Sequence, residues 1–458
     1  MTVMGIGLHG GAVETIKWLS KQGAQVTATD IGKKEVLEKS LKKLKGLKNI
    51  KIITDQHRPE DFSRADLVVK NPAVPWTNKY IKIALEKNIP VKTDADLFFE
   101  NCSSEKIIGV TGTKGKTTTA LLIYEILKNC SVKVVKVGIG QEAVLDKLEK
   151  IDKDTFVIFE LSSWRLSGLS NIKKGPAIAV ISNIYPDHLN YYFSMQEYVN
   201  DKKNIFKYQK KGGLVVANWD NEGSREMASE AKNEIIYFSL NKNDKENCVF
   251  IEEGKIFFKK DGDKKELMLL DEIKKTRGHH NISNILSALA VAVFLKADFS
   301  CVKKALMNFT GVPHRLEFVG EKRGVKFYND SASTMPQSSV AGISAFLKNI
   351  WLICGGASKN LDLSPLAEKI SKTKYVKGVF LLKGTATEEL EKIIKETGGK
   401  NKIIGNYDDI ETVVEDAFEK ASDGEVVLLS PGCASFGMFK NEFDRGDKFK
   451  EAVKKITS

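Results

Sequence analysis

The chain has 458 residues, 42% hydrophobic and 28% charged, which is typical of a globular protein of about three domains. No apolar run reaches the roughly 18 residues of a membrane span, and the first residues do not resemble a signal peptide, so membrane insertion is not expected. The net charge of +12 comes from lysines dispersed among glutamates, which favours anionic small molecules over nucleic acid as partners. We expect reduced thiols of a cytoplasmic protein at Cys102, Cys130, Cys248, Cys301, Cys354 and Cys433.

The first part of the chain, residues 1–103, alternates strand-like and helix-like stretches, which predicts a parallel α/β domain. Its turn, Gly5-Ile-Gly7-Leu-His-Gly10, follows a strand and opens a helix, and Asp30 ends the next strand about 20 residues later. This pattern is compatible with a dinucleotide site, with a site for another diphosphate such as a UDP-sugar, or with a structural turn. The polar stretch 101–106 is expected to be a linker.

A second α/β unit, predicted over 104–310, contains a phosphate-binding loop. In a standard loop, four residues separate a first glycine from Gly-Lys-Ser/Thr, and at the position of that first glycine this chain has Val110. The loop nevertheless connects the strand KIIGV to a helix, which is where backbone N–H groups and the helix dipole bind anions. We expect Lys116 to reach the β- and γ-phosphates of ATP and Thr117 to place its hydroxyl group on Mg²⁺. The helix is expected to have an apolar side formed by Ala120, Leu121, Tyr124, Ile126 and Leu127.

Polar residues follow two further strands of this unit. Glu160 ends the run TFVIFE and is predicted to bring a carboxylate to Mg²⁺. His188 follows the run AIAVISNI and could be a metal ligand, a substrate contact or a loop residue. The pair Lys202 and Lys203, on the helical stretch SMQEYVNDKKNIF, is by itself typical of a solvated surface.

Further polar clusters lie later in the chain. Asn281 and Asn284, near the start of a long apolar helix, could contact adenine or ribose or could cap the helix. Arg315 suits a bidentate phosphate contact. A third α/β unit, predicted over 311–458, has polar motifs after its strand-like runs, where open α/β sheets bind ligands. These motifs are NDSAST, GGASKNLD and SPGCASFGMFKN.

In combination, the motifs resemble those of the Mur ligases, which are ATP-dependent amide-forming enzymes of peptidoglycan precursor synthesis. The loop of that family, T-G-T/S-x-G-K-S/T, matches Thr111 to Thr117, so Val110 is normal there. The resemblance runs from about Gly5 to Gly446 and is greatest to members that add D-glutamate to UDP-N-acetylmuramoyl-L-alanine. It implies a cytoplasmic monomer with three domains: a UDP-sugar-binding Rossmann-like domain (1–103), an ATP-binding P-loop ATPase-like domain (104–310) and a second Rossmann-like domain that binds the amino acid (311–458).

The resemblance also implies roles for individual residues. Two Mg²⁺ ions would be bound by Thr117, Glu160, His188 and Lys202. The lysine would be carbamylated, because a cationic lysine would be repelled by the metal ions. The catalytic residues would be Lys116, His188 and Lys202, with His188 as a candidate base. ATP would contact Gly112, Thr113, Lys114, Gly115, Lys116, Thr117, Thr118, Asn281, Asn284, Arg315 and Asp330. The UDP-sugar and D-glutamate would contact Leu8, His9, Asp30, Asn71, Pro72, Ser162, Thr334, Lys359, Ser435 and Phe436.

The chain departs from the family pattern at several positions, which concern substrate contacts rather than the metal or phosphate machinery. Gly138 replaces an asparagine, Ala332 a lysine, His9 a small polar residue, and Glu442 an aromatic residue, with Phe443 one place further on. Two alternatives stay open. One is a Mur-like ligase for a different amino acid or acceptor, although the N-terminal glycine-turn domain argues against a folate ligase. The other is a nucleotide-binding or redox protein that uses this turn for NAD.

Overall fold

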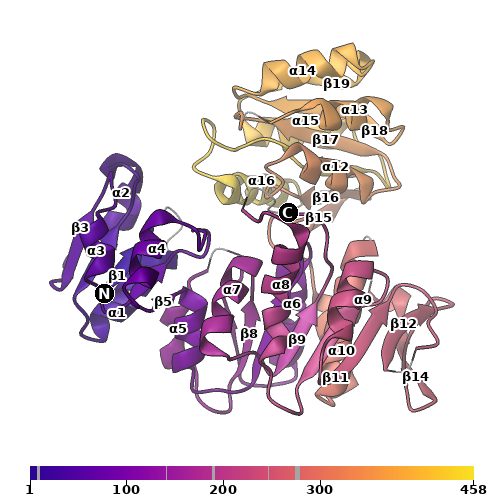
Figure 1. Cartoon of the computed structure of the whole chain (residues 1–458). Helices are drawn as coiled ribbons and strands as arrows, with labels where there is room; N and C mark the ends of the chain where they lie inside the picture. Colours follow the sequence, from indigo (N-terminus) through magenta and orange to yellow (C-terminus); the bar gives the residue numbers. More distant parts are fainter. Residues whose placement is uncertain are drawn as a thin grey trace. The chain divides into compact units, whose positions relative to one another are not determined.

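The computed structural model describes residues 1–7, 11–140, 142–187, 191–245, 247–273, 279–359 and 361–457. Strands and helices alternate along the chain and form three β-sheets, which confirms the predicted α/β class (Figure 1). Contacts divide the chain into two compact units, one with Met1–Ile273 and His279–Asn308, the other from Phe309 onward. The domain boundaries near residues 103 and 310 stay a prediction. Among the described helices, none is both long and apolar enough to cross a membrane.

The first sheet is parallel, with strand order β3-β2-β1-β4-β5. Its strands are β1 (Thr2–Met4), β2 (Val26–Thr29), β3 (Ile50–Ile53), β4 (Val68–Lys70) and β5 (Val91–Lys92). Its helices are α1 (Gly11–Lys21), α2 (Lys34–Lys42), α3 (Pro59–Ser63), α4 (Lys79–Glu86) and α5 (Asp94–Asn101). The strand order reverses between β1 and β4, and such a switch point is where doubly wound sheets bind ligands.

The second sheet has nine strands in the order β14-β13-β12-β11-β10-β9-β6-β8-β7. The strands are β6 (Ile107–Thr111), β7 (Val134–Val137), β8 (Phe156–Glu160), β9 (Ile178–Ile181), β10 (Leu214–Asn218), β11 (Glu234–Ser239), β12 (Cys248–Glu252), β13 (Lys255–Lys260) and β14 (Asp263–Leu269). The helices are α6 (Lys116–Asn129), α7 (Ser163–Ile172), α8 (Met195–Lys207), α9 (Glu222–Ser229), α10 (His279–Phe294) and α11 (Phe299–Asn308), with short 3₁₀ helices at Leu145–Lys150 and Leu270–Glu272.

Strand β6, which leads into the phosphate-binding loop, is buried along its whole length between β8 and β9. Strands buried on both faces are continuous apolar runs, and this is why KIIGV was identifiable. At the other end, β12, β13 and β14 are antiparallel, and β13 and β14 are joined by the two-residue turn Asp261-Gly262. Strand β14 forms the edge and carries exposed charged residues, including Lys264 and Lys265, which discourage pairing with another chain.

The third sheet lies in the second unit, with order β15-β16-β20-β17-β18-β19; only β15 is antiparallel to its neighbour. The strands are β15 (Glu317–Lys322), β16 (Val325–Asn329), β17 (Ile350–Gly355), β18 (Val376–Leu382), β19 (Ile403–Tyr407) and β20 (Val426–Leu429). The helices are α12 (Pro336–Ser344), α13 (Ser364–Lys372), α14 (Thr387–Glu396), α15 (Ile410–Lys420) and α16 (Glu442–Thr457), with a 3₁₀ helix at Lys400–Lys402.

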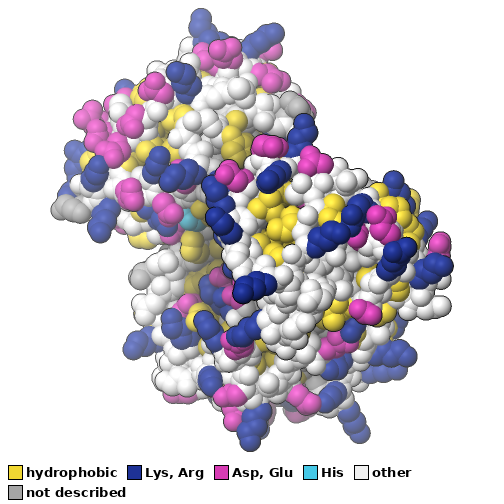
Figure 2. Space-filling model, turned by 90° about the vertical axis from the view of Figure 1, so that its left-hand side faces the viewer, with side chains coloured by type: hydrophobic (Ala, Val, Ile, Leu, Met, Phe, Trp, Pro, Cys, Tyr) yellow, Lys and Arg dark blue, Asp and Glu magenta, His cyan; other side chains and the backbone are white. Residues whose placement is uncertain are grey.

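The surface agrees with the expected distribution of charge. On the face seen in Figure 2, lysine and arginine side chains are interspersed with acidic ones and do not form one continuous basic patch. Ion pairs between lysines and carboxylates at exposed positions, such as Lys133 with Asp152 and Lys455 with Glu411, fit the same description. The lysines therefore behave as a solvated surface on this face.

One expectation about the cysteines is wrong. Cys130, which follows α6, and Cys301, in α11, form a disulfide with their Cα atoms 5.2 Å apart. The two residues are 171 positions apart in the chain and meet only because α11 packs against α6. No spacing between cysteines in the sequence therefore predicts the disulfide. Cys102, Cys248, Cys354 and Cys433 are free thiols, as expected.

Candidate active site

The phosphate-binding loop lies between the end of β6 and the start of α6. Gly112 and Gly115 have φ angles of +146° and +85°, in the region that favours glycine. The loop is braced from the end of β9, because Asn183 accepts from the backbone N–H of Thr113 and, through Oδ1, from that of Lys114, both at 2.8 Å. The amides of the first turn of α6 have no intrahelical acceptor, and they are the groups that suit a phosphate.

Two side chains pack against this loop. The ammonium group of Lys116 donates to the carbonyl oxygen of Gly112 at 3.0 Å, so the side chain lies across the loop. The buried Asn284, on α10, accepts from the hydroxyl group of Thr119 at 3.2 Å. A Cβ atom at Gly115 would lie 2.4 Å from Oδ1 of Asn284, so only glycine fits there. The structure therefore brings Lys116 and Asn284 together at the loop.

Oxygen atoms suitable for Mg²⁺ meet beside the loop. The hydroxyl group of Thr117 donates to Oε2 of Glu160 at 2.9 Å, and the backbone N–H of Gly140 donates to the same oxygen at 3.1 Å. Within the described part of the chain, no three His, Cys, Asp or Glu side chains gather as a metal site. Mg²⁺ commonly binds through one or two protein oxygens together with phosphates and waters, so the hydroxyl group and the carboxylate fit it.

Lys202 and Lys203 occupy different environments. Lys202 is 1% exposed, and its ammonium group donates to the carbonyl oxygen of Gly112 at 3.0 Å. Burial, together with the nearby charge of Lys116, holds the pKa of Lys202 well below its usual value. Lys203 instead forms an ion pair with Glu230 at 2.7 Å. Only Lys202 of this pair therefore faces the loop, and its depressed pKa favours the neutral amine, which is the form that can react with CO₂.

The N-terminal glycine turn lies at the switch point between β1 and β4. The carboxylate of Asp30 accepts from the backbone N–H of Gly7 at 3.0 Å and from that of Gly32 at 2.8 Å, so it holds the turn in place. Asn71, which follows β4, approaches so closely that a Cβ atom at Gly5 would lie 3.0 Å from the Cβ atom of Asn71. Glycine at position 5 is therefore required by a close approach as well as by its φ angle of +90°.

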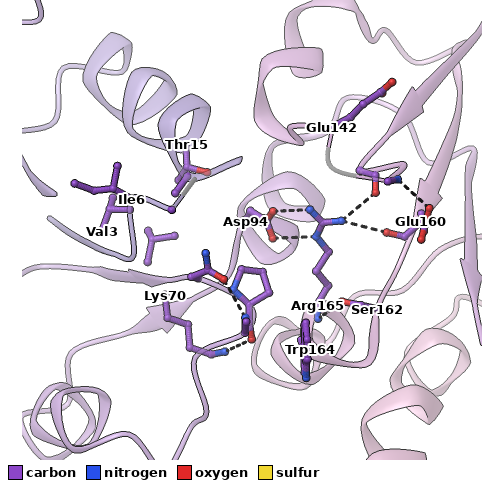
Figure 3. A pocket seen from close by; sticks show the side chains of 18 residues that line it. Val3, Ile6, Thr15, Lys70, Asp94, Glu142, Glu160, Ser162, Trp164 and Arg165 are labelled. Carbon is purple, nitrogen blue, oxygen red and sulfur yellow. Dashed lines mark hydrogen bonds and ion pairs between the residues drawn. The ribbon is translucent and has the colours of Figure 1, made fainter. Parts of the chain in front are cut away.

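A cavity of about 350 Å³ extends from this turn to Glu160, the carboxylate predicted for Mg²⁺ (Figure 3). Its lining includes Gly7, Asn71 and Pro72 from the first sheet, and Glu160 and Ser162 from the end of β8 and the start of α7. Ser162 caps α7, because its hydroxyl group accepts from the backbone N–H of residue 165 at 3.3 Å. One cavity thus contains residues predicted for the UDP-sugar and a residue predicted for Mg²⁺.

The residues predicted for the amino acid lie together in the second unit. The ammonium group of Lys359 donates to the hydroxyl group of Thr334 at 2.8 Å. Reciprocal backbone hydrogen bonds between Ala357 and Ala434 hold the loop of Lys359 beside that of Ser435. These loops follow β16, β17 and β20, which are parallel neighbours, so the cluster lies at the carboxyl edge of the sheet. The next residue of the third loop, Phe436, is 62% exposed.

Two of the residues predicted for ATP also lie in the second unit. Arg315 is exposed. Asp330 is buried, and its carboxylate accepts from the hydroxyl groups of Ser333 at 2.6 Å and Ser430 at 2.7 Å. Burial raises the pKa of Asp330 to about 6. This carboxylate therefore faces the interior of its unit, and a direct contact with ATP stays a prediction.

Sequence reasoning missed the fully buried Arg445 of α16. Its guanidinium group donates to the hydroxyl and carbonyl oxygens of Ser331, both at 2.9 Å, and to the carbonyl oxygen of Cys433 at 3.2 Å. It thereby braces the two loops that carry Thr334 and Ser435. The signal that could have found it is an arginine on the buried side of a helix whose other cations are lysines.

Asn281 and Thr118 lie in the first turns of α10 and α6, respectively. Leu8, His9 and His188 lie outside the described residues.

Comparisons with known proteins agree with this arrangement. Residues 110–292 match the family model of the Mur ligase middle domain, and residues 314–433 match that of the Mur ligase glutamate ligase domain. The chain is 37% identical to the UDP-N-acetylmuramoylalanine--D-glutamate ligase of Roseiflexus sp. (strain RS-1), over 99% of this chain and 98% of the relative. It is 36% identical to the protein of the same name from Acetivibrio thermocellus, over 100% of this chain and 96% of the relative.

Solved structures share the fold. The UDP-N-acetylmuramate-alanine ligase MurC of Thermotoga maritima has a TM-score of 0.60 at 20% identity, over 99% of both chains. The MurF ligase of the same organism, solved in complex with ADP, has a TM-score of 0.53 at 19% identity, over 87% of this chain and 97% of that one. Together with the relatives that match over nearly the whole length, these findings establish that the chain belongs to the Mur ligase family.

Proposed function

We infer that this protein is an ATP-dependent ligase that joins D-glutamate to UDP-N-acetylmuramoyl-L-alanine in peptidoglycan precursor synthesis. The observation that carries this inference is the similarity, over nearly the whole chain, to relatives named for that reaction. The site geometry is compatible with it, because a phosphate-binding loop, a diphosphate-type glycine turn and a cluster around Lys359 supply one place for each substrate.

The reaction we propose has two steps. The carboxylate of UDP-N-acetylmuramoyl-L-alanine attacks the γ-phosphorus of ATP, and the bond from this phosphorus to the β–γ bridging oxygen breaks. ADP departs, and the substrate becomes an acyl phosphate. The amine of D-glutamate then attacks the acyl carbon, and the tetrahedral intermediate expels phosphate to form the amide. Lys116 lies on the loop, where its charge can stabilise the negative charge that develops during phosphoryl transfer.

We propose that two Mg²⁺ ions serve the first step, held by Thr117, Glu160, His188 and a carbamate on Lys202. When bound, Mg²⁺ neutralises phosphate charge and polarises the transferred group. The hydrogen bond between Thr117 and Glu160 supports this, as does the burial of Lys202 beside the loop. The second step needs a neutral amine, and His188 is the base we propose for its proton.

On the amino-acid side, we propose that D-glutamate is held by Lys359, Thr334, Ser435 and Phe436. Lys359 offers a cation for a carboxylate, and its existing hydrogen bond to Thr334 fixes the direction of the ammonium group. The UDP-sugar would occupy the cavity of Figure 3, which Asn71 and Pro72 line, beside the glycine turn that Asp30 holds.

The experiment that tests the function is ADP release by the purified chain with UDP-N-acetylmuramoyl-L-alanine and a panel of amino acids. We expect release only with D-glutamate, with one amide formed per ADP. Release with another amino acid, or without the UDP-sugar, would contradict the assignment. Tighter binding of NAD than of the UDP-sugar would favour a redox protein.

The monomeric state and the cytoplasmic location also stay proposals. Light scattering after size-exclusion chromatography tests the monomeric state.

A further inference from the structure

The cavity of Figure 3 contains a cation that the proposed reaction does not use. Arg165, in the first turn of α7, lines this cavity with a side chain that is 15% exposed. Its Nη2 and Nε atoms donate to the two carboxylate oxygens of Asp94, at 3.0 and 3.3 Å. Its Nη1 atom donates to the carbonyl oxygens of Gly138, at 3.2 Å, and Glu160, at 3.4 Å. One guanidinium group therefore joins α5, the turn after β7 and the end of β8.

Position 138 has to be glycine for this arrangement to exist. Gly138 has a φ angle of +62°, and a Cβ atom there would lie 2.7 Å from Nη1 of Arg165 and 2.9 Å from the ring of Phe159. Phe159 is buried, so the ring cannot move aside easily. Any side chain at position 138 would displace the guanidinium group of Arg165. Because glycine has no side chain, the guanidinium group has room there.

The contacts of Arg165 lead to the metal-binding carboxylate. Gly138 and Gly140 belong to one turn, and the N–H of Gly140 donates to the same Glu160 oxygen that accepts from Thr117. Arg165 thus fixes both the turn that supplies this N–H and the backbone of Glu160. The bidentate partner Asp94 offsets the positive charge, so Arg165 orients Glu160 through the backbone and does not form an ion pair with it.

We propose that Arg165 is a positioning residue of this ligase, which holds the carboxylate of Glu160 toward Thr117 in the space that Gly138 leaves open. The proposal rests on the proposed function in one respect, that Glu160 serves the Mg²⁺ bound with ATP. A purely structural Arg165 would stabilise the packing of α7 on α5 and would leave metal binding unchanged.

The first test compares Arg165→Gln and Arg165→Lys with a matched control, Arg225→Gln. Arg225 is also a partly buried arginine of the first unit, and it donates to the carbonyl oxygen of Trp219 at 2.7 Å. The measurements are calorimetric titration of Mg²⁺ into the ADP complex, the midpoint of thermal unfolding, kcat, and the KM for D-glutamate.

We expect Arg165→Gln to weaken Mg²⁺ binding about tenfold or more and to lower kcat similarly, with an unchanged KM for D-glutamate. Arg165→Lys should restore only part of the loss, because an ammonium group lacks the planar fork. The control should bind Mg²⁺ as the wild type does. If Arg165→Gln lowers the unfolding midpoint but binds Mg²⁺ and turns over as the control does, the proposal is overturned.

The second test uses position 138. Asparagine tolerates a positive φ angle. The side chain in Gly138→Asn should therefore compete with the guanidinium group of Arg165 for space and should strain the backbone less. We expect Gly138→Asn to weaken Mg²⁺ binding, and the double variant with Arg165→Gln to be little worse than either single variant, since both remove one arrangement. Losses that multiply would contradict the proposal. If Arg165→Gln does not fold, Arg165→Lys and Gly138→Asn allow the same comparison.

The proposed function and the positioning role of Arg165 can be disproved independently of each other. Mg²⁺ titration into the ADP complex needs no amino acid, whereas the D-glutamate assay on the wild type tests the proposed function alone. A wild type inactive with D-glutamate but with metal binding that depends on Arg165 would overturn only the function. An active wild type whose metal binding ignores Arg165 would overturn only the positioning role.

Discussion

The hydroxyl group of Thr117 donates a hydrogen bond of 2.9 Å to the carboxylate of Glu160, and this contact joins the start of α6 to the end of β8. The two residues meet because β6 and β8 are parallel neighbours whose register pairs Val110 with Glu160. The loop after β6 and the acid at the end of β8 are therefore brought to one edge of the sheet. Backbone pairing thus fixes the positions of Thr117 and Glu160 relative to each other along the strand direction.

Two variants of Thr117 can separate the role of its hydroxyl group from that of its side-chain volume. Thr117→Val keeps the shape, and we expect a fall of about 100-fold in kcat/KM for ATP, with a higher Mg²⁺ requirement. Thr117→Ser should stay within about tenfold of the wild type, because it keeps the oxygen. ADP release over a range of Mg²⁺ concentrations measures both. Equal activity of the valine and serine variants would show that this oxygen is not used.

The loop lysine should be indispensable for phosphoryl transfer. We expect Lys116→Ala to lower the rate of ATP-dependent product formation about 1,000-fold or more, because the positive charge of Lys116 stabilises the negative charge that develops during phosphoryl transfer. Lys133→Ala, which removes only a surface ion pair with Asp152, is the matched control and should be active. Amide formation followed by chromatography measures both variants. Near-normal turnover of Lys116→Ala would contradict the assignment of the loop.

The buried lysine should act as a carbamate. Lys202→Ala should be nearly inactive, and short-chain carboxylic acids should partly restore its activity by replacing the missing anion. Lys203→Ala, which loses only its ion pair with Glu230, should keep activity and should not respond to the acids. The measurement is ADP release with and without added acid. Full activity of Lys202→Ala without rescue would exclude the carbamate.

The disulfide can be tested by counting thiols. Of the six cysteines, two are paired in Cys130–Cys301, so denatured unreduced protein should titrate four thiols and reduced protein six. Cys301→Ser should lower the midpoint of thermal unfolding, because the bond closes a loop of 171 residues; the chain-entropy description limits its contribution to about 5 kcal/mol. Six reactive thiols in unreduced protein would contradict the bond.

The buried Asp330 should make stability depend on pH. Its pKa is raised by burial from 3.8 to about 6, so the folded state binds more protons than the unfolded state between these values. Stability contributed at this site is therefore lost as the pH rises from about 4 to about 6. The midpoint of thermal unfolding of the wild type, relative to Asp330→Asn, should fall over that range in scanning calorimetry. A constant difference would contradict this assignment.

Parallel strands and their end residues could be predicted from the sequence. The run KIIGV and the run ending in Glu160 are apolar enough to identify buried strands, and parallel strands present their carboxyl ends at one edge. The face of α6 was predicted less well, because Leu122 and Ile123 are buried while Leu121 is only partly so. Since α10 and α11 also pack against α6, one apolar side does not describe it.

Helical spacing in the sequence also distinguishes Lys202 from Lys203, in agreement with the choice of Lys202 from the family resemblance. Tyr198, Lys202 and Ile205 recur at helical spacing and are all buried, so Lys202 lies on the apolar stripe of α8. By contrast, the position of Arg165 could not be predicted, since it depends on the backbone conformation of Gly138, and neither could a disulfide whose partners meet only through helix packing.

The turn between β13 and β14 offers a place for a reporter. Asp261 and Gly262 are both exposed and have φ angles of +53° and +82°, which suits a tight hairpin turn. Strand β14 is six strands from β6, and at about 4.8 Å per strand the turn is carried on an edge about 29 Å across the sheet from β6. A fluorescent dye or an epitope inserted between these two residues would therefore label the enzyme without reaching its phosphate-binding loop.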